Sequence, residues 1–324
     1  MPEEDTLSPP EFVVSRRYDD FVTFAQETRT WALDFRQLDE GPFEAELVQI
    51  ATRPVILARC RLGRKMEQRG FPPKGYRTFG ISADHELDLV WRKRTVGPSN
   101  LMVFPPGEPL DSISEPGFHV FAISIASEVL DRAAHRMGFN NFSEIEPETD
   151  LLKGTTKTLQ TLRELAWSLT DTAAKDPGFL GNKWFRLALH EDFVDALLDV
   201  LTRGEVAPDE SGSARRSEAV ATALALIEER ARDPLSVAEL ESHCEVSART
   251  LRYAFEERFE LSPKQYMQAY RLNKVHQDLL QGHPDETSVT EVAERWGFWH
   301  MGQLAKDYRR LFGELPSETL QRRP

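Results

Sequence analysis

Cysteine is scarce in this chain, which has two, Cys60 and Cys244, among 324 residues. Two thiols are too few for a structural zinc cluster. The sequence also lacks an apolar run long enough to cross a membrane and a signal-peptide pattern at its N-terminus. We therefore expect a cytoplasmic protein in a reducing compartment, without a membrane partner.

The usual signatures of catalysis are also missing. There is no glycine-rich phosphate loop and no nucleophile elbow. Metal-dependent chemistry in a β-barrel needs clustered histidines with carboxylate support, but His85 and His119 stand alone in the N-terminal part. We predict that the chain is not an enzyme and has no catalytic residue, metal site or cofactor.

An excess of positive charge is the third feature that the chain lacks. It has 40 Lys and Arg against 53 Asp and Glu, a formal net charge of -13. From residue 214 onward the counts are 16 basic and 18 acidic residues, which leaves 24 and 35 for the rest. A nucleic-acid-binding function would therefore need a local basic stripe on a nearly neutral domain.

What the sequence does contain is a repeat. "SVAELESHCEVSARTLRYAFEERFELSP" (236–263) and "SVTEVAERWGFWHMGQLAKDYRRLFGELP" (288–316) share a pattern, and their offset grows by one residue past the central bend. Each begins with a serine and has a glutamate three residues later, the signature of a helix capping box. Each continues through a bend into a second helix with apolar residues every four positions. The pattern predicts two helix-turn-helix units, whose turn and core residues are Leu240, Leu251, Phe255, Phe259, Trp296, Gly297, Phe298, Leu304, Tyr308 and Phe312.

Residues 263–281, between the two units, are predicted to form a single helix. Ser262 is placed to cap it and Pro263 suits its first turn. At 1.5 Å per residue the helix would be about 28 Å long, a suitable length for holding two recognition helices about one DNA turn (~34 Å) apart. The sequence thus favours a protein that reads two successive major grooves.

The segments "VSARTLRYAFEERFELSPKQYMQAYRLNKV" and "VTEVAERWGFWHMGQLAKDYRRLFGELPSE" resemble the DNA-binding domain of the AraC/XylS family of bacterial transcription regulators. Ala293, Gly297, Phe298, Gly313 and Pro316 are among the positions that carry the resemblance, which extends over 220–320. One departure is Glu245, which occupies a turn position where such units often have glycine. A positive φ there would add strain of about 1–2 kcal/mol.

The core-facing positions determine which residues of each second helix can reach DNA. Arg249 and Arg252 are the best candidates for reading guanine, because an arginine fork reaches O6 and N7 together. Met301 and Gly302 allow close approach to thymine methyl groups, whereas Lys306 is better placed for phosphate. The predicted base contacts are Ala248, Arg249, Arg252, Tyr253, His300, Met301, Gly302 and Gln303. The predicted backbone contacts are Ser247, Thr250, Lys306, Arg309 and Arg310.

The rest of the chain is predicted to be β-rich and then helical, so the fold class is α+β with several domains. The predicted boundaries are a disordered tail (1–17), a β-rich cupin-like sensory domain (18–150), a helical region for dimerisation (151–201), a flexible linker (202–217) and the AraC/XylS-type domain (218–321), with units at about 236–259 and 288–312. The cupin-like barrel and the dimerising helices are what the resemblance implies. The apolar stripes of 151–201 equally suit packing against the barrel.

The expected function is sequence-specific transcription regulation in the bacterial cytoplasm and nucleoid. The resemblance implies an effector-responsive activator that binds double-stranded promoter or operator DNA as a homodimer and contacts RNA polymerase. The alternative is a cupin-like enzyme, or an oligomerisation module without a sensory role, fused to a DNA-binding domain. The effector is unknown; aromatic residues that suit either a pocket or plain core are Trp31, Phe35, Tyr76, Phe79, Trp91 and Phe104.

Overall fold

The computed structural model describes residues 11–28, 30–84, 89–91, 94–207, 214–233 and 235–322. The first strand, β1 (Phe12–Tyr18), pairs antiparallel with β3 (Ala45–Ala51) over its whole length. The prediction of a disordered tail was therefore wrong for residues 12–17. Three prolines and several acids within the first eleven residues suggested a tail, but strand β1 begins directly after them.

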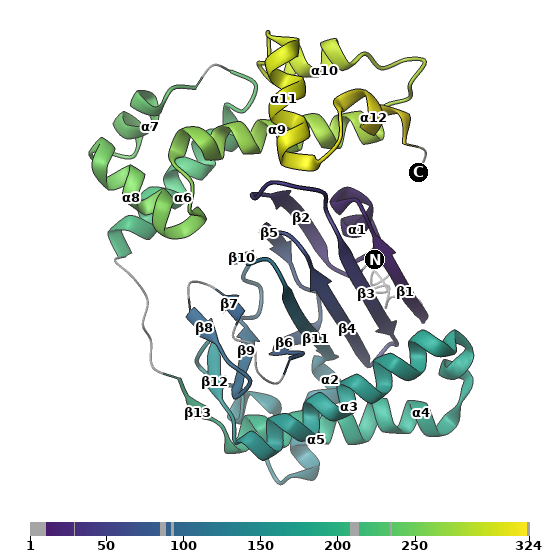
Figure 1. Cartoon of the computed structure of the whole chain (residues 1–324). Coiled ribbons are helices and arrows are strands. Elements are labelled where there is room, and N and C mark those ends of the chain that lie inside the picture. The colour runs from purple at the N-terminus through teal and green to yellow at the C-terminus, as the bar shows by residue number, and fades with distance from the viewer. Residues whose placement is uncertain are drawn as a thin grey trace, which may run out of the picture.

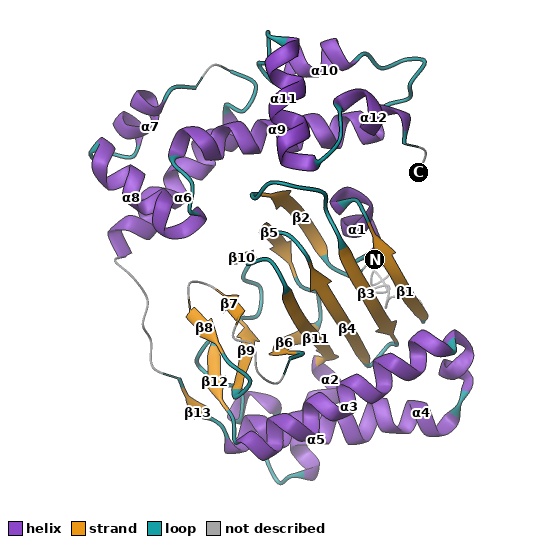
Figure 2. Ribbon diagram, in the orientation of Figure 1, coloured by secondary structure: helices purple, strands orange, loops and turns teal. Residues whose placement is uncertain are grey.

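Two main sheets make up the N-terminal domain (Figure 1; Figure 2). The larger has eight strands in the order β1-β3-β4-β11-β6-β9-β12-β13, and the smaller has three in the order β10-β5-β2. A separate pair is formed by β7 and β8. The bounds of these strands are β2 Ala32–Gln37, β4 Val55–Leu62, β5 Met66–Phe71, β6 Tyr76–Ser82, β7 Leu89–Trp91, β8 Arg94–Val96, β9 Asn100–Phe104, β10 Leu110–Ser114, β11 Phe118–Ala126, β12 Leu151–Lys153 and β13 Glu205–Val206.

The predicted fold class is confirmed, since a β-rich N-terminal part precedes a helical C-terminal part. The strands do not, however, close into a barrel over the described ranges. No ladder joins the three-stranded sheet to the eight-stranded one in this part of the chain. The prediction of a β-rich N-terminal domain is therefore confirmed, whereas the predicted closed barrel was wrong for the described strands.

Helices cover the large sheet on the side away from the C-terminal domain (Figure 1). They are α2 (Ser127–Arg136), α3 (Thr156–Lys175), α4 (Lys183–Leu187) and α5 (Phe193–Arg203). The apolar stripe of α3 is buried with residues of the sheet in one cluster that contains Leu159, Leu162, Ala166 and Leu169. The sequence left open whether this stripe packs on the sheet or mediates self-association. Because the α3 stripe is buried on the sheet, it is not available for self-association.

The C-terminal domain consists of helices α6 to α12, arranged around the long α9 (Figure 1). Their bounds are α6 Ala214–Glu229, α7 Val237–His243, α8 Ala248–Phe259, α9 Pro263–Gln281, α10 Val289–Arg295, α11 Met301–Phe312 and α12 Pro316–Gln321. The predicted linker of 202–217 needs correction at both ends. Residues 202–203 complete α5 and 205–206 form β13, while 214–217 already belong to α6; residues 208–213 lie outside the described part.

One hydrophobic cluster runs through both domains. It includes Phe21 of α1 (Phe21–Glu27) and Phe35 of β2 together with Tyr266 of α9 and Phe312 of α11. Phe21 stacks on His276 with ring centroids 4.9 Å apart. The N-terminal domain thus packs directly on the helices that carry the predicted DNA-reading residues. In the described segments, every helix is too short or too polar to span a bilayer.

Candidate DNA-binding interface

The two helix-turn-helix units are built on buried aromatic side chains. In the first, Phe255 and Phe259 of α8 surround Tyr266, with ring centroids 5.5 and 4.4 Å from it. In the second, Tyr308 and Phe312 of α11 lie 4.6 Å apart. All ten residues predicted for the turns and cores are buried except Gly297 and Phe298, which are half-buried at the second turn.

The two turns differ as their sequences predict. Gly297 adopts a φ of +78°, which glycine tolerates without strain. Glu245 occupies the turn of the first unit with a φ of +52°, the positive value for which backbone strain was expected from the sequence. Trp296 packs under the second turn and donates its indole N–H to Asp278 of α9 at 2.9 Å. The neighbouring Trp299 is 71% exposed, directly before α11.

The first recognition helix, α8, presents its N-terminal half to solvent. Ser247 caps it by accepting a hydrogen bond from the Thr250 amide, so both hydroxyl residues sit at the helix start. Arg249 lies over the ring of Tyr253, 5.3 Å from its centroid. Arg252 instead forms an ion pair with Glu256 at 2.7 Å. Of the two predicted guanine readers, Arg249 is therefore the one without a carboxylate partner in the described residues, and Arg252 must exchange its partner to reach a base.

The second recognition helix, α11, is less uniformly exposed. His300, Gly302 and Gln303 face solvent, but Met301 is half-buried against the core. The Gln303 amide donates to the buried carboxylate of Asp307 at 2.9 Å, which fixes its orientation. The structure thus leaves Met301 with less contact surface than the sequence suggested.

The residues of α11 that were predicted to contact the DNA backbone differ in their ion pairs. Lys306 and Arg309 are exposed and have no ion pair within the described part of the chain. Arg310 forms ion pairs with Asp307 at 3.3 Å and with Glu40 of the N-terminal domain at 3.1 Å. Of the predicted backbone contacts on α11, Lys306 and Arg309 are therefore unpaired in the described residues, whereas Arg310 pairs with a residue of the N-terminal domain.

Comparison with known proteins agrees with this geometry. Residues 240–322 match a family model described as a helix-turn-helix domain. The chain is 37% identical over 105 residues to the probable thc operon regulatory protein of Rhodococcus erythropolis, and 38% identical over 97 residues to the XylDLEGF operon transcriptional activator 1 of Pseudomonas putida. The C-terminal domain belongs to the AraC/XylS family.

The match to these two relatives covers 32% and 30% of this chain, and 32% and 29% of their own lengths. Among solved structures, a probable AraC family transcriptional regulator from Rhodopseudomonas palustris is 37% identical, covering 33% of this chain and 98% of that one with a TM-score of 0.30. The AraC-like transcriptional activator CuxR is 14% identical, and the match covers 87% of this chain and 99% of that one with a TM-score of 0.39. The chain thus spans about a third of the length of the two curated relatives.

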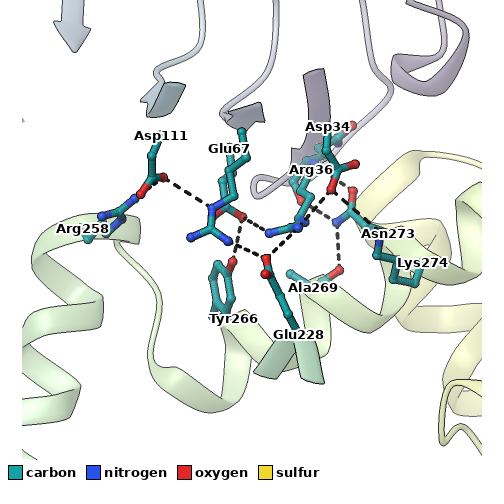
Figure 3. A network of polar contacts seen from close by, with 12 residues as sticks. Asp34, Arg36, Glu67, Asp111, Glu228, Arg258, Tyr266, Ala269, Asn273 and Lys274 are labelled. Carbon is teal, nitrogen blue, oxygen red and sulfur yellow. Dashed lines mark hydrogen bonds and ion pairs between the residues drawn. The ribbon is translucent and has the colours of Figure 1, made fainter. Parts of the chain in front are cut away.

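The AraC-type domain is held by a polar network that sequence reasoning missed (Figure 3). Arg36 of β2 contacts Glu67 of β5 at 3.2 Å and Glu228 of α6 at 3.0 Å. Tyr266 of α9 donates its hydroxyl to Glu67 at 2.7 Å. Arg258 of α8 pairs with Asp111 of β10. We call this set of contacts the interdomain clasp.

Neighbouring charges outweigh the effect of burial on the pKa values of Arg36 and Asp111 in the interdomain clasp. Burial alone would lower the pKa of Arg36, but the Glu67 carboxylate and the other groups beside it together have a larger, opposite effect. The pKa is therefore raised above its ordinary value, and the guanidinium stays charged. Burial raises the pKa of Tyr266 well above its usual range, and Glu67 adds to the effect, so this hydroxyl stays a donor. Burial would raise the pKa of Asp111, but Arg258 and Arg69 together hold it below its usual range.

The N-terminal domain also contacts the C-terminal ends of both recognition helices. Lys65 pairs with Glu260, the C-cap of α8, at 2.7 Å. The Leu311 carbonyl at the end of α11 accepts hydrogen bonds from the Gln37 side chain at 2.7 Å and from the Gly41 amide at 3.0 Å. The predicted base contacts lie at the opposite, N-terminal ends of the two helices, so these contacts with the N-terminal domain do not involve them.

The histidines and cysteines that the sequence singled out can be located in part in the described residues. His119 pairs with Asp84 at 3.1 Å and packs edge-on against Trp167, while His85 lies outside the described residues. Groups of three or more potential metal ligands are not found in the described ranges. Cys60 and Cys244 are free thiols in separate domains.

Proposed function

We propose that this chain is a transcription regulator that binds double-stranded DNA through α8 and α11 in two successive major grooves. The observation that carries the proposal is the pair of exposed helix starts held on one 19-residue helix, α9. At 1.5 Å per residue α9 is about 28 Å long, so it suits two reading helices about one DNA turn (~34 Å) apart. The named activator among the relatives supports activation of transcription as the outcome.

The base-reading role falls on the exposed side chains of the two helix starts. Arg249 is the principal reader of guanine, supported by Ala248 and Tyr253 on α8 and by His300, Gly302 and Gln303 on α11. Lys306 and Arg309 neutralise the charge of phosphate groups, whereas Ser247 and Thr250 at the start of α8 donate hydrogen bonds to phosphate oxygens. Arg252 and Arg310 contribute after their carboxylate partners are displaced.

The same proposal includes regulation by a small-molecule effector in the N-terminal domain, a homodimer and contact with RNA polymerase. The interdomain clasp supports the first, since it links the sheets directly to α6, α8 and α9. For the dimer, α4 supplies exposed apolar surface at Trp184, which is 72% exposed, and at Leu187.

Two substitutions test the assignment. Arg249→Ala removes a base reader, so we expect it to weaken binding by about 1–3 kcal/mol and to relax the preference at one base position. Lys306→Ala removes a phosphate contact, so it should weaken binding on all sequences and reduce the salt slope by about one. Affinities are measured on a library of single-base variants at two salt concentrations. Equal loss on every sequence for Arg249→Ala would contradict the assignment of Arg249.

A further inference from the structure

A cavity lies between the two main sheets of the N-terminal domain. Its lining comes from β2, β5 and β10 of the small sheet and from β3, β4, β6, β9 and β11 of the large one. Six aromatic side chains contribute to the lining, namely Phe24, Trp31, Phe35, Trp91, Phe104 and Phe118. Four of these were among the aromatic residues considered from the sequence, whereas Tyr76 and Phe79 do not line the cavity. Such a lining suits an aromatic ring, because edge and face contacts add to the burial of apolar area.

Two amide side chains give the cavity a polar character without charge. Gln49 and Gln68 are 1% and 8% exposed, and both line it. Gln49 donates to Thr30 at 2.8 Å, but its Oε1 has no hydrogen-bond partner among the described residues. The Nε2 of Gln68 likewise has none within these ranges. Buried polar atoms of this kind are costly unless paired, so a ligand that supplied one donor and one acceptor would satisfy both.

The absence of charged side chains from the described lining narrows the class of ligand. None of the described residues that line the cavity is an Asp, Glu, Lys, Arg or His. An ionised carboxylate or ammonium group would lose its hydration there without gaining a partner. The cavity therefore favours a neutral molecule.

The three-stranded sheet separates this cavity from the AraC-type domain. Along β2, Leu33 and Phe35 line the cavity, while the alternate residue Arg36 belongs to the interdomain clasp. On the neighbouring strands, Gln68 and Ser112 line the cavity, while the adjacent positions 67 and 111 contact α9 and α8. This follows from the alternation of side chains along a strand. The cross-strand pairs agree, because Gln68 on the central strand is in register with Phe35 on one side and with Ser112 on the other.

We propose that the cavity binds a neutral aromatic molecule bearing a hydroxyl or primary amide group, and that the three-stranded sheet transmits its binding to the AraC-type domain. The transmission to the AraC-type domain rests on the proposed function, whereas the binding of the ligand does not. The ligand's polar group pairs with Gln49 and Gln68, and its ring packs among the aromatic side chains. Any displacement of β2, β5 or β10 acts on the interdomain clasp, because the same strands carry both faces.

The first half is tested by calorimetry on the full chain with benzamide, benzoate and benzylamine as matched probes. Benzamide is expected to bind, with the two ions at least about 10-fold weaker because no charged partner faces them. Gln49→Leu and Gln68→Leu should each weaken benzamide binding by about 3- to 10-fold, whereas Gln160→Leu on the exposed face of α3 should not. Failure of benzamide to bind, or tighter binding of benzoate, would overturn the proposed ligand class.

The second half is tested by DNA affinity with and without saturating benzamide. We expect a change of about 5-fold or more, matched by the same factor in benzamide affinity when DNA is bound. Glu228→Gln, which weakens the interdomain clasp at α6, should reduce this factor, while Glu229→Gln beside it should leave it unchanged. Unchanged affinity of a DNA-binding wild type would overturn the transmission. A wild type that binds no specific DNA would instead contradict the proposed function and leave the calorimetric result standing.

Discussion

At the scale of single residues, the sequence predicted which side chains are buried and which are exposed, but it did not predict their ion-pair partners. The four-residue spacing of Leu251, Phe255 and Phe259 correctly placed them in the core and left Arg249 and Arg252 exposed. Their difference in availability depends on Glu256, whose ion pair with Arg252 is one of several geometries open to an exposed side chain. The sequence also indicated that Glu245 would be strained if its φ were positive, because helix-turn-helix units often have glycine at this position, and its φ is positive.

Relief of this turn strain is the first prediction. Glu245→Gly should stabilise the chain by up to about 1 kcal/mol, because glycine adopts a positive φ freely while its greater unfolded-state entropy offsets part of the gain. Glu241→Gly, in the middle of α7, should destabilise it by about 1 kcal/mol. Thermal unfolding of both variants provides the measurement. A loss of stability with Glu245→Gly would show that the turn is not strained.

Asp20 provides a prediction about pH. Its buried carboxylate contacts His276 at 2.6 Å and also caps α1 through the Val22 and Thr23 amides. Burial raises the pKa of Asp20, but the hydrogen bond and charge of His276 outweigh this and lower it below the usual 3.8. A lowered pKa means that the fold favours the carboxylate. The stabilisation is therefore complete above pH 3.8 and is lost as the pH falls through the lower folded value.

We expect Asp20→Asn to destabilise the chain by about 1–3 kcal/mol near pH 7, since asparagine retains the cap and loses the charge. The difference from the wild type should shrink as the pH falls below 3.8. Asp19→Asn, at an exposed neighbour, should have little effect at any pH. Urea unfolding across this pH range is the measurement. A difference that stays constant with pH would contradict the role assigned to the charge.

At the scale of elements, periodicity located the helices of the C-terminal domain well. The helix expected over 263–281 corresponds to α9, Pro263–Gln281. Strand β1 was missed because it begins directly after a stretch rich in proline and acids, where composition alone suggests a tail. The capping signals also differed in outcome. Ser236 and Glu239 form the predicted capping box, but Ser288 makes no side-chain cap hydrogen bond, so that half of the prediction was wrong.

This difference between two similar motifs is open to measurement. Ser236→Ala should cost about 1 kcal/mol, because it removes the hydroxyl that caps α7. Ser288→Ala should cost only a few tenths of a kcal/mol, because α10 does not use that hydroxyl. Chemical denaturation of the two single variants compares them directly. Equal losses would mean that both serines cap their helices in solution.

At the scale of the whole molecule, the interdomain clasp lay beyond prediction from one sequence. Its partners are far apart along the chain, as with Arg36 and Glu228 or Glu67 and Tyr266. On the strands they appear only as polar residues at alternate positions, a pattern that a solvent-facing sheet would also produce. The open arrangement of the sheets was likewise inaccessible, because strand periodicity does not state which edges pair. The tandem reading units were predictable because they repeat within the sequence.

The central claim is that two helices on one rigid spacer read DNA together, and selection of bound sequences from a random duplex library by the full chain tests it most directly. The account predicts enrichment of two short elements about 10 base pairs apart, and loss of the α8-bound element alone with Arg249→Ala. Enrichment of a single element, or of sequences without a fixed spacing, would contradict reading by both helices.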